Sequence, residues 1–500
     1  MNGSNVYLGV DAGLSRVTVG AYDTTGQRHA IESCPTPSSV PQVGHHEVGP
    51  EQLWESVTSC IRGVVAKIGT DRIVGVGVGG HGHGAYLLDA QGSPVHPAIR
   101  STDGRAASVV HRWNEEGKAA EVKRILGYEP FAADPLSILG WFQAKNPEIL
   151  SDLATLCFCK DYIRYRLTGK IATDTMEASV FTAPGENEYA AHAFDVLDLD
   201  VSVDILPPKV DSLALAGRVS SAAAEQTGLL RGIPVATGLQ DIGTTALGLG
   251  AHKPGQAILI VGTWGQSIII NRTGEAQYNE GGLRRRFIGN SYIQYQGFKS
   301  ATASLDWFTE ELGRLWEAQA CRENKDLFDV YDAVIESVPI GARGVLFHPY
   351  IAGSVEHPQA QGGFFGLNIQ HSAEDLLRAV YEGIALAIGR QLKAIAPEQT
   401  SLDVRLGGGG ARSKIWSEIF AGVVDSQITL THGDEPGARG AAICGAMAAG
   451  SYDDLSDAID AFVAPSEIIF PNSVQKQQYS ALRARFDILL NAMRPTWEHF

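Results

Sequence analysis

The chain has 500 residues, 44% of them hydrophobic and 19% charged, with a formal net charge of −16. This composition is that of a globular protein, and the length predicts two to four domains. The acidic net charge argues against a nucleic-acid partner. The apolar runs are far shorter than the roughly 18 residues of a membrane span, and the N-terminus lacks the features of a signal peptide. We therefore expect a cytoplasmic protein with no membrane partner and with six reduced cysteines.

The first half alternates predicted strands with helices. Residues 6–22 read as an apolar hairpin with the segment 11–13 at its tip, and a turn at 24–26 leads into a third strand. A helix is expected over 50–68, and 71–89 read as two strands around a glycine-rich bend. Strands flanked by helices predict an α/β architecture. The mainly helical stretch 102–203, with a helix at 161–167, reads as an insertion that bears on substrate choice.

The second half repeats this order. A strand, a turn at 263–265 and another strand span 256–271, a helix is expected over 373–395, and the strand LDVRL leads into four glycines at 407–410. The same succession of elements predicts two copies of one α/β unit. We place the first domain at residues 1–245 and the second at 246–500, with a final helix at about 474–493.

Two hairpin tips have the form of anion-binding turns. The segments 11–13 and 262–265 contain glycines whose backbone N–H groups can point at one anion from opposite sides, although each taken singly is more simply an ordinary β-turn. No GxxxxGK[ST] motif occurs, so any nucleotide phosphates must be held without a P-loop.

Two glycine-rich segments suggest nucleotide sites of different kinds. Residues 75–80 satisfy GxGxxG, but they run on into a strand rather than opening a helix, so the dinucleotide-binding alternative is disfavoured. Residues 407–410 follow an alternating strand and precede an amphipathic helix at 413–424. The first amides of that helix and its positive dipole would then lie beside a bound phosphate or ribose.

Several polar residues are candidates for chemistry. Asp241 stands alone between an apolar strand and a small-residue helix, where it either caps the helix or acts as a catalytic carboxylate. His81 and His83 alternate on the glycine-rich bend, so we expect them to face one side and to hydrogen-bond a sugar or the backbone rather than bind zinc. Asp103, beside Arg105, is either an exposed ion pair, a helix cap or a polyol ligand.

Taken together, these segments resemble the FGGY carbohydrate kinases, which share a superfamily with hexokinases, actin and the heat-shock-type chaperone ATPases. The resemblance covers almost the full length. It is carried in the family's order and spacing by VDAG at 10–13, LLDAQGSPVHPAI at 87–99, DGR at 103–105, KDYIRYRLTGKIATD at 160–174, GLQDIGTTALG at 238–248, VGTWGQS at 261–267, HPYIAGS and GGFFGL within 348–367, and LGGGGARSKIWSEIFAGV at 406–423. It implies two ribonuclease H-like domains of the actin and hexokinase type with a cleft between them.

The resemblance also implies ATP and Mg²⁺ as cofactors and a role for each candidate residue. Asp241 would be the general base toward the acceptor hydroxyl, and Asp11 a carboxylate near magnesium. The residues implied at the nucleotide are Gly13, Gly262, Thr263, Gly409, Gly410 and Ala411, and those implied at the sugar are His81, His83, Asp103 and Asp241. A base of near-normal pKa suffices, because the metaphosphate-like transition state asks for little proton removal until late.

Some positions depart from the family pattern. Leu14 stands where relatives carry Thr or Gly, and Thr18 where they carry a basic residue that Arg16 could replace from nearby. The segment 81–83 and Ile242 differ from D-xylulose kinases, so the resemblance favours the L-xylulose kinase branch and a ketopentose acceptor. A tetritol or keto-acid sugar kinase and a sugar-binding regulator without activity are the alternatives. A homodimer is compatible with the resemblance.

Overall fold

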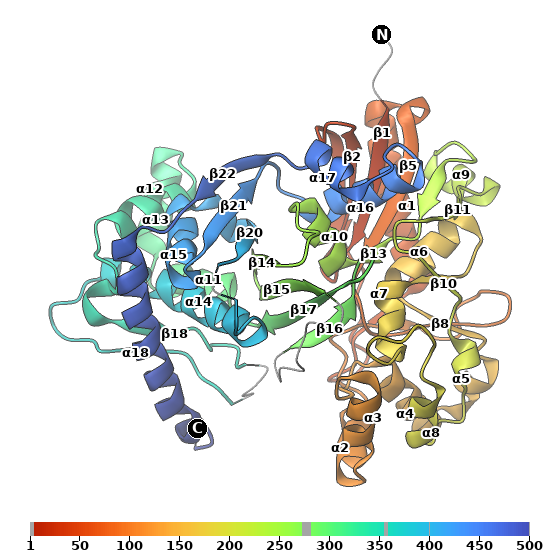
Figure 1. Cartoon of the computed structure of the whole chain (residues 1–500), viewed down its shortest axis with the longest axis horizontal. Helices are drawn as coiled ribbons and strands as arrows, with labels where there is room; N and C mark the ends of the chain where they lie inside the picture. The colour runs from red at the N-terminus through yellow and green to blue at the C-terminus, as the bar shows by residue number, and fades with distance from the viewer. Residues whose placement is uncertain (1–4, 273–281, 355–358, 400, 500) are drawn as a thin grey trace.

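The computed structural model describes residues 5–272, 282–354, 359–399 and 401–499. Two seven-stranded sheets dominate it (Figure 1). The N-terminal sheet has the order β11-β12-β5-β1-β2-β3, with β13 beside β5. Its strands are β1 (Val6–Ala12), β2 (Arg16–Asp23), β3 (Arg28–Pro35), β5 (Ile73–Gly80), β11 (Leu215–Arg218), β12 (Pro234–Ala236) and β13 (Leu239–Gln240).

The C-terminal sheet has the order β16-β17-β15-β14-β20-β21-β22. Its strands are β14 (Gln256–Val261), β15 (Gly265–Arg272), β16 (Leu283–Arg286), β17 (Ser291–Phe298), β20 (Asp403–Gly407), β21 (Gln427–Thr431) and β22 (Pro465–Ile469). In both sheets the first strand pairs antiparallel with the second and parallel with the strand that follows a long helix. The predicted repeat of one α/β unit is therefore confirmed.

Helices cover the sheets and form the insertion. The N-terminal lobe, meaning the N-terminal sheet and the elements packed on it, carries α1 (Pro50–Ile68), α6 (Cys159–Thr168) and α9 (Ser221–Thr227); the C-terminal lobe carries α11 (Thr302–Glu311), α12 (Arg314–Glu323), α13 (Leu327–Glu336), α14 (Ala373–Ile395), α15 (Lys414–Val424) and α18 (Ser473–Trp497). The insertion holds α2 (Ala107–Glu115), α3 (Lys118–Leu126), α4 (Pro135–Lys145), α5 (Pro147–Asp152), α7 (Thr175–Ala178) and α8 (Ala191–Val196).

Four short strand pairs complete the fold: β4 (Glu47–Val48) with β7 (Ala98–Ile99), β6 (Tyr86–Leu88) with β8 (Thr155–Cys157), β9 (Thr173–Asp174) with β10 (Lys209–Val210), and β18 (Leu346–His348) with β19 (Gly363–Phe365). The second strand expected in 71–89 is thus β6, which pairs outside the main sheet. Across the described ranges, no helix has the length and apolar character needed to cross a membrane.

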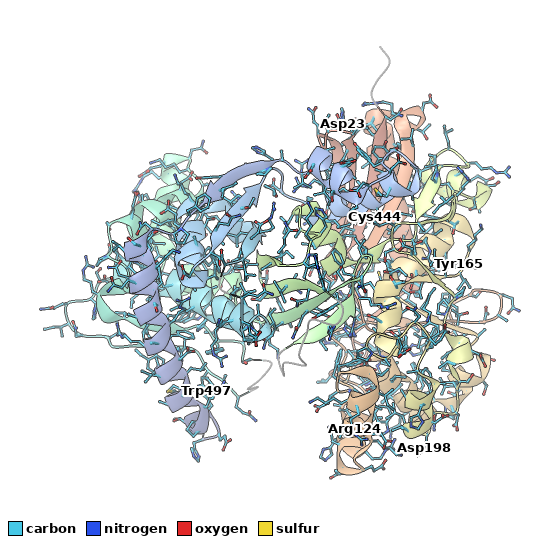
Figure 2. All side chains as sticks on the ribbon, viewed as in Figure 1. Asp23, Arg124, Tyr165, Asp198, Cys444 and Trp497 are labelled. Carbon is cyan, nitrogen blue, oxygen red and sulfur yellow. The ribbon has the colours of Figure 1, made fainter. Side chains whose placement is uncertain are left out.

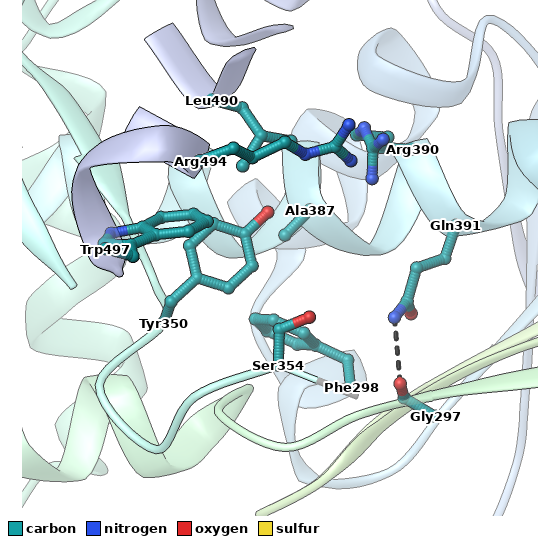
Figure 3. A pocket seen from close by; sticks show the side chains of 10 residues that line it. All are labelled: Gly297, Phe298, Tyr350, Ser354, Ala387, Arg390, Gln391, Leu490, Arg494 and Trp497. Carbon is teal, nitrogen blue, oxygen red and sulfur yellow. Dashed lines mark hydrogen bonds between the residues drawn. The ribbon is translucent and has the colours of Figure 1, made fainter. Parts of the chain in front are cut away.

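The long helices form where the apolar stripe is clearest. Leu53, Val57 and Ile61 are fully buried along α1, Pro50 occupies its first turn, and Gly69 follows its end. Both α1 and α14 have the predicted bounds. The final helix, α18, packs on α15 and β18 of the C-terminal lobe. Figure 3 shows its residue Trp497 in a pocket of that lobe, where Gln391 Nε2 donates to the Gly297 carbonyl oxygen at 2.9 Å.

Helix α16 (Pro436–Ala448) lies on the N-terminal sheet although it comes from the second half of the chain. It packs on β1 and β5, and Figure 2 labels its Cys444 beside these strands, far from Trp497. A Cβ at Gly9 would overlap the Ala438 carbonyl oxygen, and a Cβ at Gly77 that of Ala441. Gly75 and Gly77 of the GxGxxG segment therefore serve this close helix packing, whereas Gly80 faces Cys159 and Lys160 of α6.

The two lobes share a buried core between the sheets (Figure 1). Helix α10 (Asp241–Gly248) packs against α16, with Leu247 of α10, Ile443 of α16 and Ile258 of β14 in one cluster, and α17 (Leu455–Phe462) borders it. Gly248 and Gly440 let the two helix backbones approach closely. The domain boundary at 245/246 stays a prediction, and this packing adds that α16 completes the N-terminal lobe.

Candidate active site

Asp241 is the first residue of α10, directly after β13. The N-cap position is Gln240, and within the described chain the Asp241 carboxylate accepts one hydrogen bond, from the Ile242 N–H to Oδ1 at 2.7 Å. The side chain therefore does not cap the helix in the usual way. It keeps partial solvent exposure, yet burial raises its pKa to about 6, above the near-normal value expected from the sequence. A carboxylate with this pKa is ionised at neutral pH and suited to accept a proton.

Asp11 lies near Asp241, at the end of β1. Burial, together with the negative charges of Asp241 and Glu435, raises the pKa of Asp11 to about 7. Among the described residues its Oδ1 is buried without a hydrogen-bond partner, and a Cβ at Gly437 would overlap its Oδ2, so glycine at the start of α16 leaves room for this carboxylate in its present position. A cation placed between the two acids would relieve their repulsion.

The two hairpin tips have equivalent positions in the two lobes. The tip of β1 and β2 closes with a bond from Gly13 N to Arg16 O at 3.0 Å, and the tip of β14 and β15 with one from Gly262 N to Trp264 O at 3.2 Å. Thr263 is exposed at the second tip. Each tip therefore presents backbone from the same point of its sheet, as the repeat predicts.

The positive charge near the first tip comes from an unexpected residue. The Arg16 guanidinium donates from Nε to Ser33 Oγ at 2.9 Å, on the neighbouring strand. Arg100, which follows β7, instead donates from Nη2 to the Leu14 carbonyl oxygen within the tip. The sequence analysis missed Arg100 because it lies 86 residues from Leu14 in the chain.

The glycine segment after β20 differs from the expectation. Residues Gly409–Arg412 form a 3₁₀ turn, and α15 begins only at Lys414. The Ser413 side chain caps the Trp416 N–H, and Asp332 accepts from the Ile415 N–H. The prediction that the first amides of this helix face a nucleotide is therefore wrong, because they are already bonded.

The turn itself keeps exposed backbone. Gly409 is exposed with open space around it, Ala411 is half-buried, and Gly410 is buried against Val261 and Trp416. A nucleotide that approached this turn would therefore meet Gly409 and Ala411 before Gly410.

His81 and His83 follow the end of β5 at Gly80. His83 has a φ of 58°, in the left-handed region, so strand alternation does not place the two rings as predicted. His81 is buried, neither of its ring nitrogens bonds to any described residue, and burial and Arg100 lower its pKa to about 4. Burial and Arg285 hold the pKa of His83 well below its usual range. Both imidazoles are therefore neutral at pH 7.

His83 joins the two lobes. Its Nε2 accepts from Arg285 Nη2 at 3.1 Å and lies 3.3 Å from the Tyr295 hydroxyl, and both partners belong to the C-terminal sheet. Because a guanidinium only donates, Nε2 is an acceptor and the proton of this imidazole sits on Nδ1, which is buried without a partner. His83 thus offers an unused N–H donor between the lobes.

Two further side chains near Asp241 were missed in the sequence. Glu177, on α7, is fully buried with neither carboxyl oxygen bonded within the described chain, and burial raises its pKa well above its usual range. Gln240 hydrogen-bonds Tyr295 and leaves its Oε1 without a partner. The run of three arginines at 284–286 could have pointed to Arg285, because alternation along a strand turns at least one of the three side chains inward. No sequence pattern pointed to Glu177.

Asp103 has a different environment. Its Oδ1 accepts from Arg105 N and Nε at 2.8 and 2.9 Å, and its Oδ2 from His46 N at 2.6 Å. Arg105 in turn contacts Glu47 at 2.8 Å. Asp103 is only 3% exposed, so this is a buried ion pair and the exposed alternative is wrong. Its role toward a sugar stays a prediction.

Unbonded polar atoms are concentrated in this region. They are Asp11 Oδ1, both ring nitrogens of His81, His83 Nδ1, Arg100 Nε, both carboxyl oxygens of Glu177, Gln240 Oε1 and Arg285 Nε. Buried polar groups in proteins are normally hydrogen-bonded. Some of the side chains also interact electrostatically, since Asp241 raises the pKa of Asp11, His81 lowers that of His83, and Glu177 raises that of Tyr295. The arrangement is that of a site for a polar ligand between the lobes.

The metal-binding capacity of the region is limited. Across the described residues, no three His, Cys, Asp or Glu side chains gather closely enough to hold an ion. Zinc at His81 and His83 therefore finds no support. Mg²⁺ differs, because it commonly keeps several waters and needs only one or two carboxylates together with substrate phosphates. Asp11, with its unbonded Oδ1, fits that requirement.

Comparison with known proteins extends over nearly the whole chain. Residues 6–248 match the model of the N-terminal domain of the FGGY family of carbohydrate kinases, and residues 257–449 match that of the C-terminal domain. The chain is 28% identical to the L-xylulose/3-keto-L-gulonate kinase of Escherichia coli, over 98% of this chain and 97% of that protein. It is also 28% identical to the erythritol kinase of Brucella abortus, over 99% and 97%.

A solved structure gives the same result. The xylulose kinase from Rhodospirillum rubrum superposes with a TM-score of 0.87 at 25% identity, covering 99% of this chain and 100% of that one. This likeness and the matched pair of domains confirm the expected α/β fold with two ribonuclease H-like domains.

Proposed function

This chain belongs to the FGGY family of carbohydrate kinases, and from that premise we propose that it transfers the γ-phosphoryl group of ATP to a hydroxyl of a small keto sugar. The observation that carries the proposal is the placement of Asp241 near Asp11, in a region rich in unbonded polar atoms between the lobes. Phosphoryl transfer needs a base near the attacking hydroxyl and stabilisation of the phosphate charges, and these residues are suited to both tasks.

Asp241 is the proposed general base. It accepts the proton of the sugar hydroxyl as the hydroxyl oxygen bonds to the γ-phosphorus and the bond from that phosphorus to the bridging oxygen of ADP breaks. The Nδ1–H of His83 donates to a sugar oxygen and so orients the acceptor. Asp11 would hold Mg²⁺, which when bound supplies charge neutralisation at the phosphates. His81 and Asp103 support the sugar end of the site.

The nucleotide is proposed to bind across the two hairpin tips and the glycine turn. Gly13 would face it from the N-terminal lobe, while Gly262 and Thr263 would contact the β- and γ-phosphates from the C-terminal lobe. Arg100, which bonds the first tip, supplies positive charge there in place of the basic residue absent at Thr18. Gly409, Gly410 and Ala411 would line the adenosine, with Gly409 the most exposed of the three.

For the acceptor we propose a ketopentose, with L-xylulose favoured over D-xylulose. The first relative named above is an L-xylulose kinase by its name, and Ile242 and the segment 81–83 depart from D-xylulose kinases. The kinship with an erythritol kinase keeps a tetritol as the competing acceptor. A coupled ADP-release screen with both xylulose enantiomers, both ribuloses and erythritol tests reaction class and acceptor together. Sugar binding without ADP release from any acceptor would favour a regulator instead.

The pH dependence of kcat/KM should show an acid limb from Asp241. Only the ionised carboxylate accepts a proton, so activity is present above its pKa and falls about tenfold per pH unit below about pH 6. Initial rates between pH 5 and 8 at saturating Mg²⁺ test this, since excess metal competes with protonation of Asp11. The Asp134→Asn variant should retain the limb, although burial raises the pKa of Asp134 to about 6 too. A flat profile down to pH 5 would contradict the assignment.

Substitution of Asp11 should weaken the response to Mg²⁺. In Asp11→Asn the negative charge is lost while the shape is kept, so the Mg²⁺ concentration for half-maximal rate should rise at least about tenfold. A Mg²⁺ titration at fixed ATP measures this. Asp89→Asn is a matched control, because Asp89 accepts two backbone N–H bonds in a turn outside the site. An unchanged titration curve for Asp11→Asn would remove Asp11 from the metal site.

A further inference from the structure

Arg285 is a buried cation without an acidic partner. The residue is 1% exposed, and no carboxylate of the described residues lies within ion-pair distance of it. Its Nη1 donates to the Arg284 carbonyl oxygen at 2.6 Å, its Nη2 donates to His83, and its guanidinium lies 4.9 Å from the Tyr128 ring centre. Its Nε has no partner. The charge is therefore held by neutral groups alone.

Four of the other buried arginines pair with an acid or have all three nitrogens bonded, whereas Arg100, at the first hairpin tip, resembles Arg285 in having no ion pair and an unbonded Nε within the described residues. Arg105 pairs with Asp103 and Glu47, Arg164 with Asp161, and Arg378 with Glu382. Arg439 has no acid, but its Nε, Nη1 and Nη2 all donate to oxygens of the chain. An unpaired buried charge is costly, and such residues persist where a ligand completes them.

Asp134, an acid that interacts electrostatically with Arg285, does not form an ion pair with it. The Asp134 carboxylate accepts from the Tyr128 hydroxyl at 2.7 Å and from the Leu136 N–H at 3.0 Å, so both of its oxygens are engaged. The positive charge of Arg285 opposes the rise in the pKa of Asp134 that burial causes, without direct contact between the two groups.

Arg285 also borders a pocket between the lobes. The pocket is lined by Tyr128 and residues 182–185 of the insertion and by the arginine run 284–286 of β16. Arg285 thus lies between this pocket and His83, the residue proposed to orient the acceptor. A sugar bonded to His83 Nδ1 would have one end within reach of a guanidinium that lacks a counter-ion.

We propose that the acceptor site contains a carboxylate subsite centred on Arg285, so that a five- or six-carbon keto sugar acid is bound in preference to a neutral ketopentose. The inference rests on the proposed kinase function and, within small keto sugars, replaces the neutral ketopentose as the favoured acceptor by a keto sugar acid. Arginine suits this role, because its planar donors match a carboxylate and its charge persists at every physiological pH. Ketopentoses remain acceptors that leave the subsite unused.

The test compares two acceptors that differ by one carboxylate, 3-keto-L-gulonate and L-xylulose, with wild type, Arg285→Met and Arg285→Lys. We expect wild type to favour the acid in kcat/KM by about 10- to 100-fold, the range of a charged hydrogen bond. Arg285→Met should abolish this preference mainly by raising KM for the acid, and Arg285→Lys should restore part of it. Arg218→Met is the control, since Arg218 is a strand arginine of β11 that donates from Nη1 to the Gly232 carbonyl oxygen, outside the pocket lining.

Equal kcat/KM for the two acceptors in wild type would overturn the inference while leaving the kinase proposal intact. An equal loss for both acceptors in Arg285→Met would also overturn it, because Arg285 would then act only by positioning His83. If neither acceptor releases ADP, the proposed function fails instead. Calorimetric titration of wild type and Arg285→Met with 3-keto-L-gulonate then tests the subsite by itself. The subsite proposal requires the dissociation constant of the variant to be at least about tenfold higher.

Discussion

Asp241→Asn is expected to lower kcat by about 1,000-fold while the affinity for ATP stays within about twofold of wild type. The amide has the shape of the carboxylate and can still accept the Ile242 N–H bond through its oxygen, but it cannot take a proton from the acceptor hydroxyl. The loss should appear in kcat and kcat/KM alike, because the interaction is used in the transition state. Single-turnover ADP release and calorimetric ATP titration measure the two quantities.

A control variant distinguishes loss of the proton-accepting carboxylate from a general disturbance of the start of a helix. Asp454 also stands at a helix start, where it caps α17 through the Ser456 N–H, outside the cluster around Asp241. Asp454→Asn should therefore leave kcat unchanged. An Asp241→Asn variant with wild-type turnover would sink the assignment of the base. If the protein is instead a sugar-binding regulator, wild type shows no kinase turnover and Asp241→Asn still binds the sugar.

Gly77→Ala should destabilise the protein by about 3 kcal/mol and lower Tm by roughly 5 °C or more. The new Cβ would overlap the Ala441 carbonyl oxygen of α16, which is backbone and can move only with its helix. Displacement of α16 would also shift Gly437 against Asp11, so activity should fall with stability. Thermal denaturation followed by circular dichroism, with kcat measured at 25 °C, tests both effects.

The matched control for this substitution is another strand glycine. Gly297 of β17 borders the pocket of Figure 3, and a Cβ there would meet no atom within 4 Å. Gly297→Ala should therefore melt within about 2 °C of wild type. If Gly77→Ala melts like Gly297→Ala, α16 does not rest on the sheet as described.

Local pattern predicted much of the fold correctly. The bounds of α1 and α14 follow from apolar stripes with a helical period, and the paired hairpins follow from alternation around glycine turns. These signals are local, because each depends on which face of one element meets the core. The helix predicted at 413–424 is α15, with Ser413 as its N-cap, but the bond from its first turn to Asp332 of α13, more than 80 residues earlier, was not predictable.

The candidate site was only partly predictable. Asp11 and Asp241 were identified from acids at apolar strand ends and from the family resemblance, and their roles stay predictions. Arg100, Glu177 and Arg285 were not, because each reaches the region from an element remote in sequence. The arginine run 284–286 could have indicated that one arginine turns inward, but not which groups it meets, and Arg100 and Glu177 had no distinguishing pattern.

The sequence by itself determined the repeated α/β unit, the family and the acid at the start of α10, because each is visible in hydrophobic periodicity or in the spacing of motifs along the chain. Only the tertiary structure decided that α16 crosses to the N-terminal sheet and that His83 meets Arg285 across the lobes. Both depend on close approach between segments about 200 to 430 residues apart, which no local pattern encodes.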